Sequence, residues 1–216
     1  NESIDKYNYI ATEPSEGFRA ILEKNPPKGV SKVISATGSS IPVDDNSIDG
    51  IIVAQAFHWM ASDDTINEFH RILKKENNQT PTPGRVSLIW NQMDSSIPWL
   101  NELDRGILTR YYDDTSIPRY ITGDWEKCFK TDNATKKFST LKKWECPTNV
   151  SKPMTRQQII DRILSVSVIA RRNDIEKKEI SDEVEALLRT HPDVRDIKDG
   201  ELIMQYKTDV VSCLAI

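Results

Sequence analysis

The chain has 216 residues, enough for one domain with a full hydrophobic core, or for a domain with a modest appendage. Charged residues make up 29% of it and the formal net charge is −4, unlike the basic composition of a nucleic-acid-binding protein. Its three cysteines are widely spaced, and no apolar run approaches the roughly 20 residues that span a bilayer. We therefore expect a soluble, cytoplasmic protein with reduced thiols and with no nucleic-acid or membrane partner.

Strands and helices alternate from residue 7 to residue 91. Short β-branched and aromatic runs between turn residues predict the strands. Pro14 is expected in the first turn of a helix with Phe18 on its apolar face, and Ser62 is expected to cap a second helix. The alternation predicts right-handed crossovers and a parallel α/β sheet with helices on both faces. The expected strands are residues 7–12, 30–36, 48–55 and 85–90.

After Asn91 the pattern changes to an α+β elaboration. Thr155 and Gln158 have the spacing of a capping box, which predicts a helix start. We expect residues 1–97 to form the core of one domain, and residues 98–216 to add substrate-side helices and terminal strands to the same sheet. The expected helices are residues 98–112, 156–164 and 174–189, and the expected strands are 138–146 and a hairpin-like pair at 201–206 and 210–214.

The strand that contains Ile51 and Val53 stops abruptly at Gln55. Ligands of open α/β sheets bind beyond the carboxyl ends of the strands, so residues 54–60 are a candidate site on physical grounds alone. The acidic residues just before this strand fit a turn better than a metal site. No pair of residues indicates a catalytic acid and base, and His58 is more readily a pocket wall than a general base.

Five motifs occur in an order that resembles the class I methyltransferases, most closely the small-molecule branch that includes trans-aconitate methyltransferase-like proteins. The resemblance extends over nearly the whole chain. The motifs are Tyr9-Ile-Ala-Thr-Glu-Pro-Ser15, Ala36-Thr-Gly-Ser-Ser-Ile-Pro42, Ser47-Ile-Asp49, Ala54-Gln-Ala-Phe-His-Trp59 and Gly84-Arg-Val-Ser-Leu-Ile-Trp-Asn91.

This resemblance implies S-adenosylmethionine as the cofactor. Glu13, followed by Pro14, stands where the family holds the ribose hydroxyls, and a carboxylate can accept from two hydroxyls at once. Thr37 and Gly38 stand where the family binds the adenine. Many relatives have an aspartate at the position of Thr37, so this contact is expected to be weaker or to come from the backbone.

The resemblance also places Ala54 and Gln55 beside the methionine part of the cofactor. Phe57, His58 and Trp59 would then line the sulfonium and the substrate, since an aromatic face attracts a cation. Trp90 is expected either in the core or in the wall of the substrate pocket.

One element of the family is missing from the chain, namely the first strand with its glycine-rich turn. In the family this strand lies between the strand that ends at Glu13 and the strand that ends at Gln55. Without it, two edges at the centre of the sheet would have no partner. We therefore expect the natural protein to have a segment upstream of residue 1, and we expect the chain as written to bind no cofactor measurably.

The sequence thus predicts a methyltransferase that acts on a small molecule by direct transfer from S-adenosylmethionine. Two alternatives remain open, a degenerate and non-catalytic relative, or another nucleotide-binding Rossmann-type enzyme in which Glu13 would hold a ribose in the same way. The oligomeric state is left open.

Overall fold

The computed structural model describes residues 7–77, 81–112, 117–146, 150–197 and 200–216, with the side chain of residue 145 left out. The chain divides into two compact units. We call the first unit Asn1–Leu88 with Arg119–Lys142 and Val211–Ile216, and the second unit Ile89–Pro118 with Lys143–Val210. The first unit joins the N-terminal residues to two later segments, and the second unit begins at Ile89.

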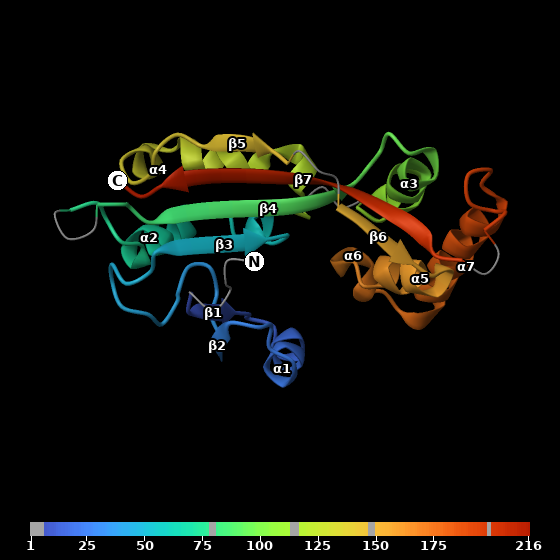
Figure 1. Cartoon of the computed structure of the whole chain (residues 1–216), viewed down its shortest axis with the longest axis horizontal. Helices are drawn as coiled ribbons and strands as arrows, with labels where there is room; N and C mark the ends of the chain where they lie inside the picture. The colour runs from blue at the N-terminus through green and yellow to red at the C-terminus, as the bar shows by residue number, and fades with distance from the viewer. Residues whose placement is uncertain (1–6, 78–80, 113–116, 147–149, 198–199) are drawn as a thin grey trace. The chain divides into compact units, whose positions relative to one another are not determined.

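The first unit contains the alternating part of the fold (Figure 1). Its strands are β1 (Tyr9–Thr12), β2 (Val30–Ile34), β3 (Gly50–Ala54), the start of β4 (Arg85–Met93) and the end of β7 (Leu202–Leu214). Its helices are α1 (Glu16–Lys24), α2 (Asp63–Ile72) and α4 (Asp132–Thr135), with 3₁₀ turns at Phe57–Trp59, Tyr120–Thr122 and Asp124–Lys130.

The strands form two separate sheets, as the missing central strand led us to expect. β1 and β2 pair in parallel as a sheet of two strands. β3 begins the second sheet, whose order is β3-β4-β7-β5, with β6 also paired to β7. Within the described residues, β1 and β3 are therefore both edge strands. The α/β fold class is confirmed.

Helix α1 differs from its expected form in two ways. It begins at Glu16 after Ser15, so Pro14 precedes the cap instead of lying in the first turn. Its apolar face is also not buried, since Phe18 and Ile21 are each 64% exposed. The amphipathic pattern predicted the helix correctly, but no described residue of the first unit buries that face.

Helix α2 begins as expected. The Ser62 side chain accepts a hydrogen bond from the backbone N–H of Thr65, and Ile66, Phe69 and Ile72 are buried. His70 on the same helix is partly buried, since its Nε2 lies 3.0 Å from the Ile216 backbone oxygen and its ring packs against Phe138.

The second unit contains β6 (Val150–Met154), most of β5 (Lys142–Glu145), and the helices α3 (Pro98–Asn101), α5 (Arg156–Leu164), α6 (Ser167–Ala170) and α7 (Asp174–Thr190). The helical stretch that begins with α3 continues as π-helical turns at Glu102–Ile107 and a 3₁₀ turn at Leu108–Tyr111. The capping box at Thr155 is confirmed, and α7 has a second one between Asn173 and Glu176.

The expected terminal hairpin was wrong, because β7 is one unbroken strand of 13 residues. Residues 207–209, which separate the two expected strands, contain none of the glycine that a tight hairpin turn favours. Backbone bonds from Asp94 to Gln205 and from Ala215 to Gly84 keep β7 antiparallel to β4 along its length.

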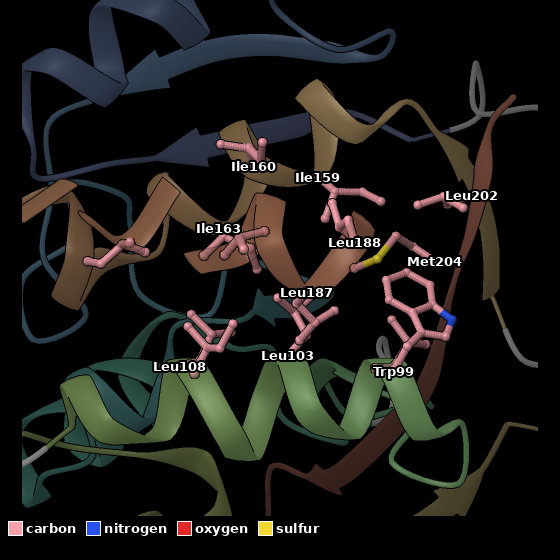
Figure 2. Packing of buried hydrophobic residues seen from close by; sticks show 14 of the residues in the cluster. Trp99, Leu103, Leu108, Ile159, Ile160, Ile163, Leu187, Leu188, Leu202 and Met204 are labelled. Atoms are coloured by element: carbon pink, nitrogen blue, oxygen red, sulfur yellow. The ribbon is translucent and has the colours of Figure 1, made fainter. Parts of the chain in front are cut away.

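The core of the second unit is formed by helix faces that meet (Figure 2). Trp99, Leu103 and Leu108 project from the α3 stretch toward residues of α5 and α7, and Leu202 and Met204 of β7 close one end. The core-facing apolar residues of α5 and α7 are between 0% and 7% exposed. Those buried on α5 and α7 are Ile159, Ile160, Ile163, Ile180, Val184, Leu187 and Leu188.

Candidate functional site

Hydrogen bonds hold the carboxyl ends of β1 and β2 together. The Glu13 N–H donates to the Ile34 backbone oxygen at 3.1 Å, which extends the β1–β2 pairing beyond both strands. Arg19 of α1 then donates from Nη1 to the Glu13 backbone oxygen at 3.2 Å and to Ser35 Oγ at 3.1 Å. Glu13 and the loop that follows β2 are thus held at the carboxyl end of the two-stranded sheet.

The Glu13 carboxylate is partly engaged. Its Oε1 accepts from the Ser15 N–H at 2.8 Å, and its Oε2 has no partner within the described part of the chain. The side chain is half-buried. The Ser15 bond fixes the direction of the carboxylate and leaves one oxygen for a hydroxyl donor. Pro14 is exposed beside it and cannot donate a backbone hydrogen bond.

Thr37 and Gly38 pack against the segment that follows β3. A Cβ built on Gly38 would lie 2.5 Å from Met60 Sδ and 3.3 Å from Thr65 Cγ2. A side chain here would have to displace the flexible end of Met60 and crowd Thr65, so glycine allows the loop to approach closely. The structure therefore brings the predicted adenine loop and the end of the 57–60 segment together.

Gln55 has φ of +57° directly after β3. A residue with a Cβ is strained in this left-handed region by roughly 1–2 kcal/mol, and such strain is concentrated at functional sites. The left-handed backbone of Gln55 ends β3, and Ala54 and Gln55 are exposed at this strand end. Pattern reasoning placed the end of the strand correctly but did not predict its left-handed conformation.

Two of the four residues expected to contact substrate have no accessible surface. Phe57 is 0% exposed and its ring packs against Phe129 and Trp125, with centroid distances of 5.3 and 6.2 Å. Trp90 lies on β4 in the second unit and is also 0% exposed. Both rings are core residues in this structure. Residues 123–137, which supply the partners of Phe57, had no expected structure.

His58 and Trp59 remain at the surface of the site. Trp59 is 41% exposed, and its ring centroid lies 5.7 Å from that of His58. Burial lowers the pKa of His58 to about 4, because desolvation disfavours the imidazolium. His58 is therefore neutral near pH 7, so it would not repel a cationic ligand next to Trp59.

Sequence reasoning missed an arginine that organises the loop before β3. Arg71 of α2 donates to the backbone oxygens of Ile41 and Val43, both at 2.9 Å. It also pairs with Asp45 and Glu68. The loop is held to α2 by one guanidinium, which has five donors in a fixed fork. In the sequence, Arg71 is recognisable only as an arginine on the polar side of a helix.

Among the described residues, no group of three or more histidine, cysteine or acidic side chains could hold a metal ion. A search of the same residues finds no helix with the length and apolar character of a membrane span. Burial raises the pKa of the Cys128 and Cys213 thiols to about 12, so neither thiol is a ready nucleophile.

Residues 2–77 match the family model of a methyltransferase domain. The part of the chain that carries the candidate site is therefore methyltransferase-like. The match includes Glu13, Thr37, Gly38, Gln55 and Trp59, the residues that the geometry keeps at the surface or at a strand end. The resemblance seen in the sequence motifs is confirmed for this segment.

Curated relatives agree with this assignment. An uncharacterised methyltransferase-like protein of Schizosaccharomyces pombe is 27% identical over 171 residues, which are 79% of this chain and 60% of that protein. An uncharacterised methyltransferase of Mycobacterium bovis is 29% identical over 184 residues, 85% of this chain and 65% of the relative. The chain thus matches less than two thirds of the length of these relatives.

One solved structure adds evidence on the fold alone. A structure named as a type II methyltransferase, from Anaeromyxobacter dehalogenans, aligns with 95% of this chain and 79% of its own, with a TM-score of 0.61 and 14% identity. The Rossmann-like methyltransferase fold class is confirmed.

Proposed function

We propose that the protein is a methyltransferase that transfers a methyl group from S-adenosylmethionine to a small molecule. The observation that carries the proposal is the Glu13 carboxylate, fixed by Ser15 at the end of β1 with Oε2 available to a ribose. The chemistry of the residues fits the cofactor, with an acid for hydroxyls, a closely packed glycine loop for a flat base and an exposed tryptophan for a sulfonium. When bound, the cofactor would supply an electrophilic methyl group.

The residues of the chain would bind and orient the cofactor, and they would transfer few protons. Glu13 would accept from the ribose hydroxyls, and the loop at Thr37 and Gly38 would pack on the adenine. Ala54 and Gln55 would meet the methionine part, and the face of Trp59 would attract the sulfonium. Direct displacement needs alignment and exclusion of water more than an acid or a base.

The uncharged imidazole of His58 would form part of the pocket wall. An imidazolium at this position would repel a sulfonium, and the burial that keeps the pKa of His58 near 4 removes that charge at neutral pH. A small metabolite as methyl acceptor and a cytoplasmic location are the further parts of this proposal. They rest on the family resemblance and on the dispersed cysteines.

Calorimetric titration with S-adenosylhomocysteine tests the cofactor assignment, on a form of the protein extended before residue 1 by the first strand of the family. Glu13→Ala should weaken binding by roughly 1–3 kcal/mol, because it removes charge-assisted hydrogen bonds. Glu16→Ala is the matched control, since Glu16 is an exposed acid in the first turn of α1. Unchanged affinity in Glu13→Ala would refute the ribose assignment.

A thermal-shift comparison separates the alternatives. Stabilisation by S-adenosylhomocysteine and not by NAD supports the methyltransferase. The opposite result would indicate another Rossmann-type enzyme. Stabilisation by neither would indicate a non-catalytic relative. The 216-residue chain alone should show no measurable binding, and micromolar affinity for it would contradict our expectation about the missing strand.

A further inference from the structure

A tight turn follows β2 in the first unit. The Ser40 N–H donates to the Thr37 backbone oxygen at 3.3 Å, which closes the turn around Gly38 and Ser39. Gly38 is the packed residue of this turn, since a Cβ on it would lie 2.5 Å from Met60 Sδ. The residues on either side of Gly38 are both exposed. The turn therefore has one side against the protein and one side that is open to a ligand.

The side chains of Thr37 and Ser39 form a pair of hydroxyls on this turn. Their oxygens, Thr37 Oγ1 and Ser39 Oγ, lie 3.3 Å apart, and either one can donate to the other. A hydroxyl has one proton to donate and two lone pairs that accept, and it rotates to suit its neighbour. When Thr37 donates to Ser39, Thr37 offers an acceptor to a ligand and Ser39 offers a donor. Reversing the bond between them exchanges these two roles, so the pair has no fixed polarity.

Two contacts with α2 fix the backbone directly after the turn. The Ile41 N–H donates to Glu68 Oε1 at 2.6 Å, and the Ile41 backbone oxygen accepts from Arg71 Nη2 at 2.9 Å. Arg71 Nε also donates to Glu68 Oε2 at 2.8 Å, so both oxygens of this carboxylate are engaged. The turn is thus held in place while its hydroxyls can still rotate. The positions of the two oxygens are fixed, whereas the directions of their protons are not.

The cofactor base is the ligand group that the proposed function assigns to this loop. The edge of adenine has an amino donor on C6 and an acceptor at N1. Hypoxanthine, the deaminated base, has the opposite pattern, with a carbonyl acceptor on C6 and an N–H donor at N1. A carboxylate on the turn would only accept, so it would pair with the amino group and repel the carbonyl. A hydroxyl pair of reversible polarity matches either edge.

We propose that Thr37 and Ser39 determine the base selectivity of the protein, and that they bind hypoxanthine nearly as well as adenine. This inference rests on the proposed function, since it takes the base of the cofactor to lie at this turn. With adenine, one hydroxyl accepts from the amino group and the other donates to N1. With hypoxanthine, the bond between the hydroxyls reverses and each takes the other role. Neither base then leaves a polar group without a partner, which is the main source of discrimination between such ligands.

Calorimetric titration with S-adenosylhomocysteine and with S-inosylhomocysteine tests this selectivity, on the same extended form of the protein as the cofactor titration. We expect the two dissociation constants to agree within about tenfold. Thr37→Asp replaces a reversible hydroxyl with a fixed acceptor. It should raise the ratio of the constants to about a hundredfold or more, because the carboxylate repels the carbonyl on C6. Thr37 is exposed, so the fold should tolerate this change, and the melting temperature checks that it does.

Two further variants separate the hydroxyl pair from a general effect on the turn. Thr37→Val removes the hydroxyl at nearly constant volume. It should weaken binding of both ligands by about two- to tenfold, because one hydrogen bond to the base is lost in each complex. Ser40→Ala changes an exposed serine of the same turn that is outside the pair, and it should leave both dissociation constants unchanged.

Failure of the base selectivity and failure of cofactor binding give different results. Binding of S-adenosylhomocysteine with a native ratio above about tenfold would refute the role of the hydroxyl pair and would leave the methyltransferase proposal intact. An unchanged ratio in Thr37→Asp would also refute that role, since these side chains would then not contact the edge of the base. Binding of neither ligand would overturn the proposed function, and the selectivity with it.

Discussion

Helices α1 and α7 have the same kind of amphipathic sequence but very different surroundings. α7 buries Ile180, Val184, Leu187 and Leu188 in the second unit, whereas α1 buries none of its residues. The described part of the second unit therefore contains partners for the apolar face of α7 that these four residues form. The first unit contains an element whose partner is not among its described residues. Amphipathicity predicts where a helix forms, and the burial of its apolar face shows whether the partner is present.

The largest test of this contrast compares two isoleucines. Ile163→Ala in the second-unit core should lower the free energy of unfolding by roughly 2–5 kcal/mol, because the side chain is 0% exposed and leaves a cavity. Ile21→Ala on α1 should change it by no more than about 0.5 kcal/mol. Urea unfolding followed by circular dichroism measures both. Similar losses at the two positions would show that the face of α1 is buried in solution.

A pH titration gives the next largest effect, in the first unit. The unfolded His58 takes up a proton below about pH 6.5, whereas the folded one stays neutral until its pKa of about 4. Stability should therefore fall as the pH falls from 6.5 to 4, by less than the roughly 3 kcal/mol of the full shift, because solvent screens the partly exposed ring. His58→Leu should remove this part of the pH dependence in urea unfolding. The pKa of His70 is also lowered by burial, so the effect of His58 is the difference between the two proteins.

The stability of the second unit should depend on pH in a lower range than that of His58. Hydrogen bonds from Ser96, then from Lys207, lower the pKa of Asp94 to about 2. This stabilisation is complete above pH 3.8 and is lost as the pH falls toward 2, for a total of about 2 kcal/mol. Asp94→Asn should abolish the loss in this range. Asp182→Asn, which removes an exposed ion pair with Lys178, should cost about 0.5 kcal/mol or less. A transition of the second unit already complete at pH 5 would contradict the assignment to Asp94.

The smallest effect concerns the end of β3. Gln55→Gly should stabilise the protein by about 0.5–1 kcal/mol, because glycine tolerates a φ of +57° without a Cβ clash. Gln55→Ala keeps the Cβ and should leave the melting temperature nearly unchanged. A gain in the alanine variant equal to that in glycine would show that the left-handed backbone is not the source of the strain.

Local signals predicted much of this fold. The apolar runs located β1, β2 and β3, and the caps at Ser62 and Thr155 fixed two helix starts, because capping is chemistry between neighbouring residues. The unbroken course of β7 was not predictable in this way. Its continuity depends on pairing with β4, β5 and β6, which no local window contains.

The candidate site was predictable to the same extent as the fold. Glu13, Gly38 and Gln55 could be predicted as candidates because strand ends and turn residues have a sequence signature. Phe57 was misjudged because its partners Trp125 and Phe129 lie in a segment without a periodic pattern. Adjacent positions such as Phe57 and Trp59 face in different directions, and only the fold decides which one is buried.

The pairing of β4 with β7 also affects how the protein is made. About 110 residues separate Met93 from Leu202, so β4 leaves the ribosome long before its neighbour is synthesised. At usual elongation rates the delay is about 5 to 20 seconds. During that time one backbone edge of β4, which carries the apolar residues Val86, Leu88 and Trp90, has no β7 to pair with. Since pairing between distant parts of a chain is also slow to form, newly made chains should depend on chaperones through that interval.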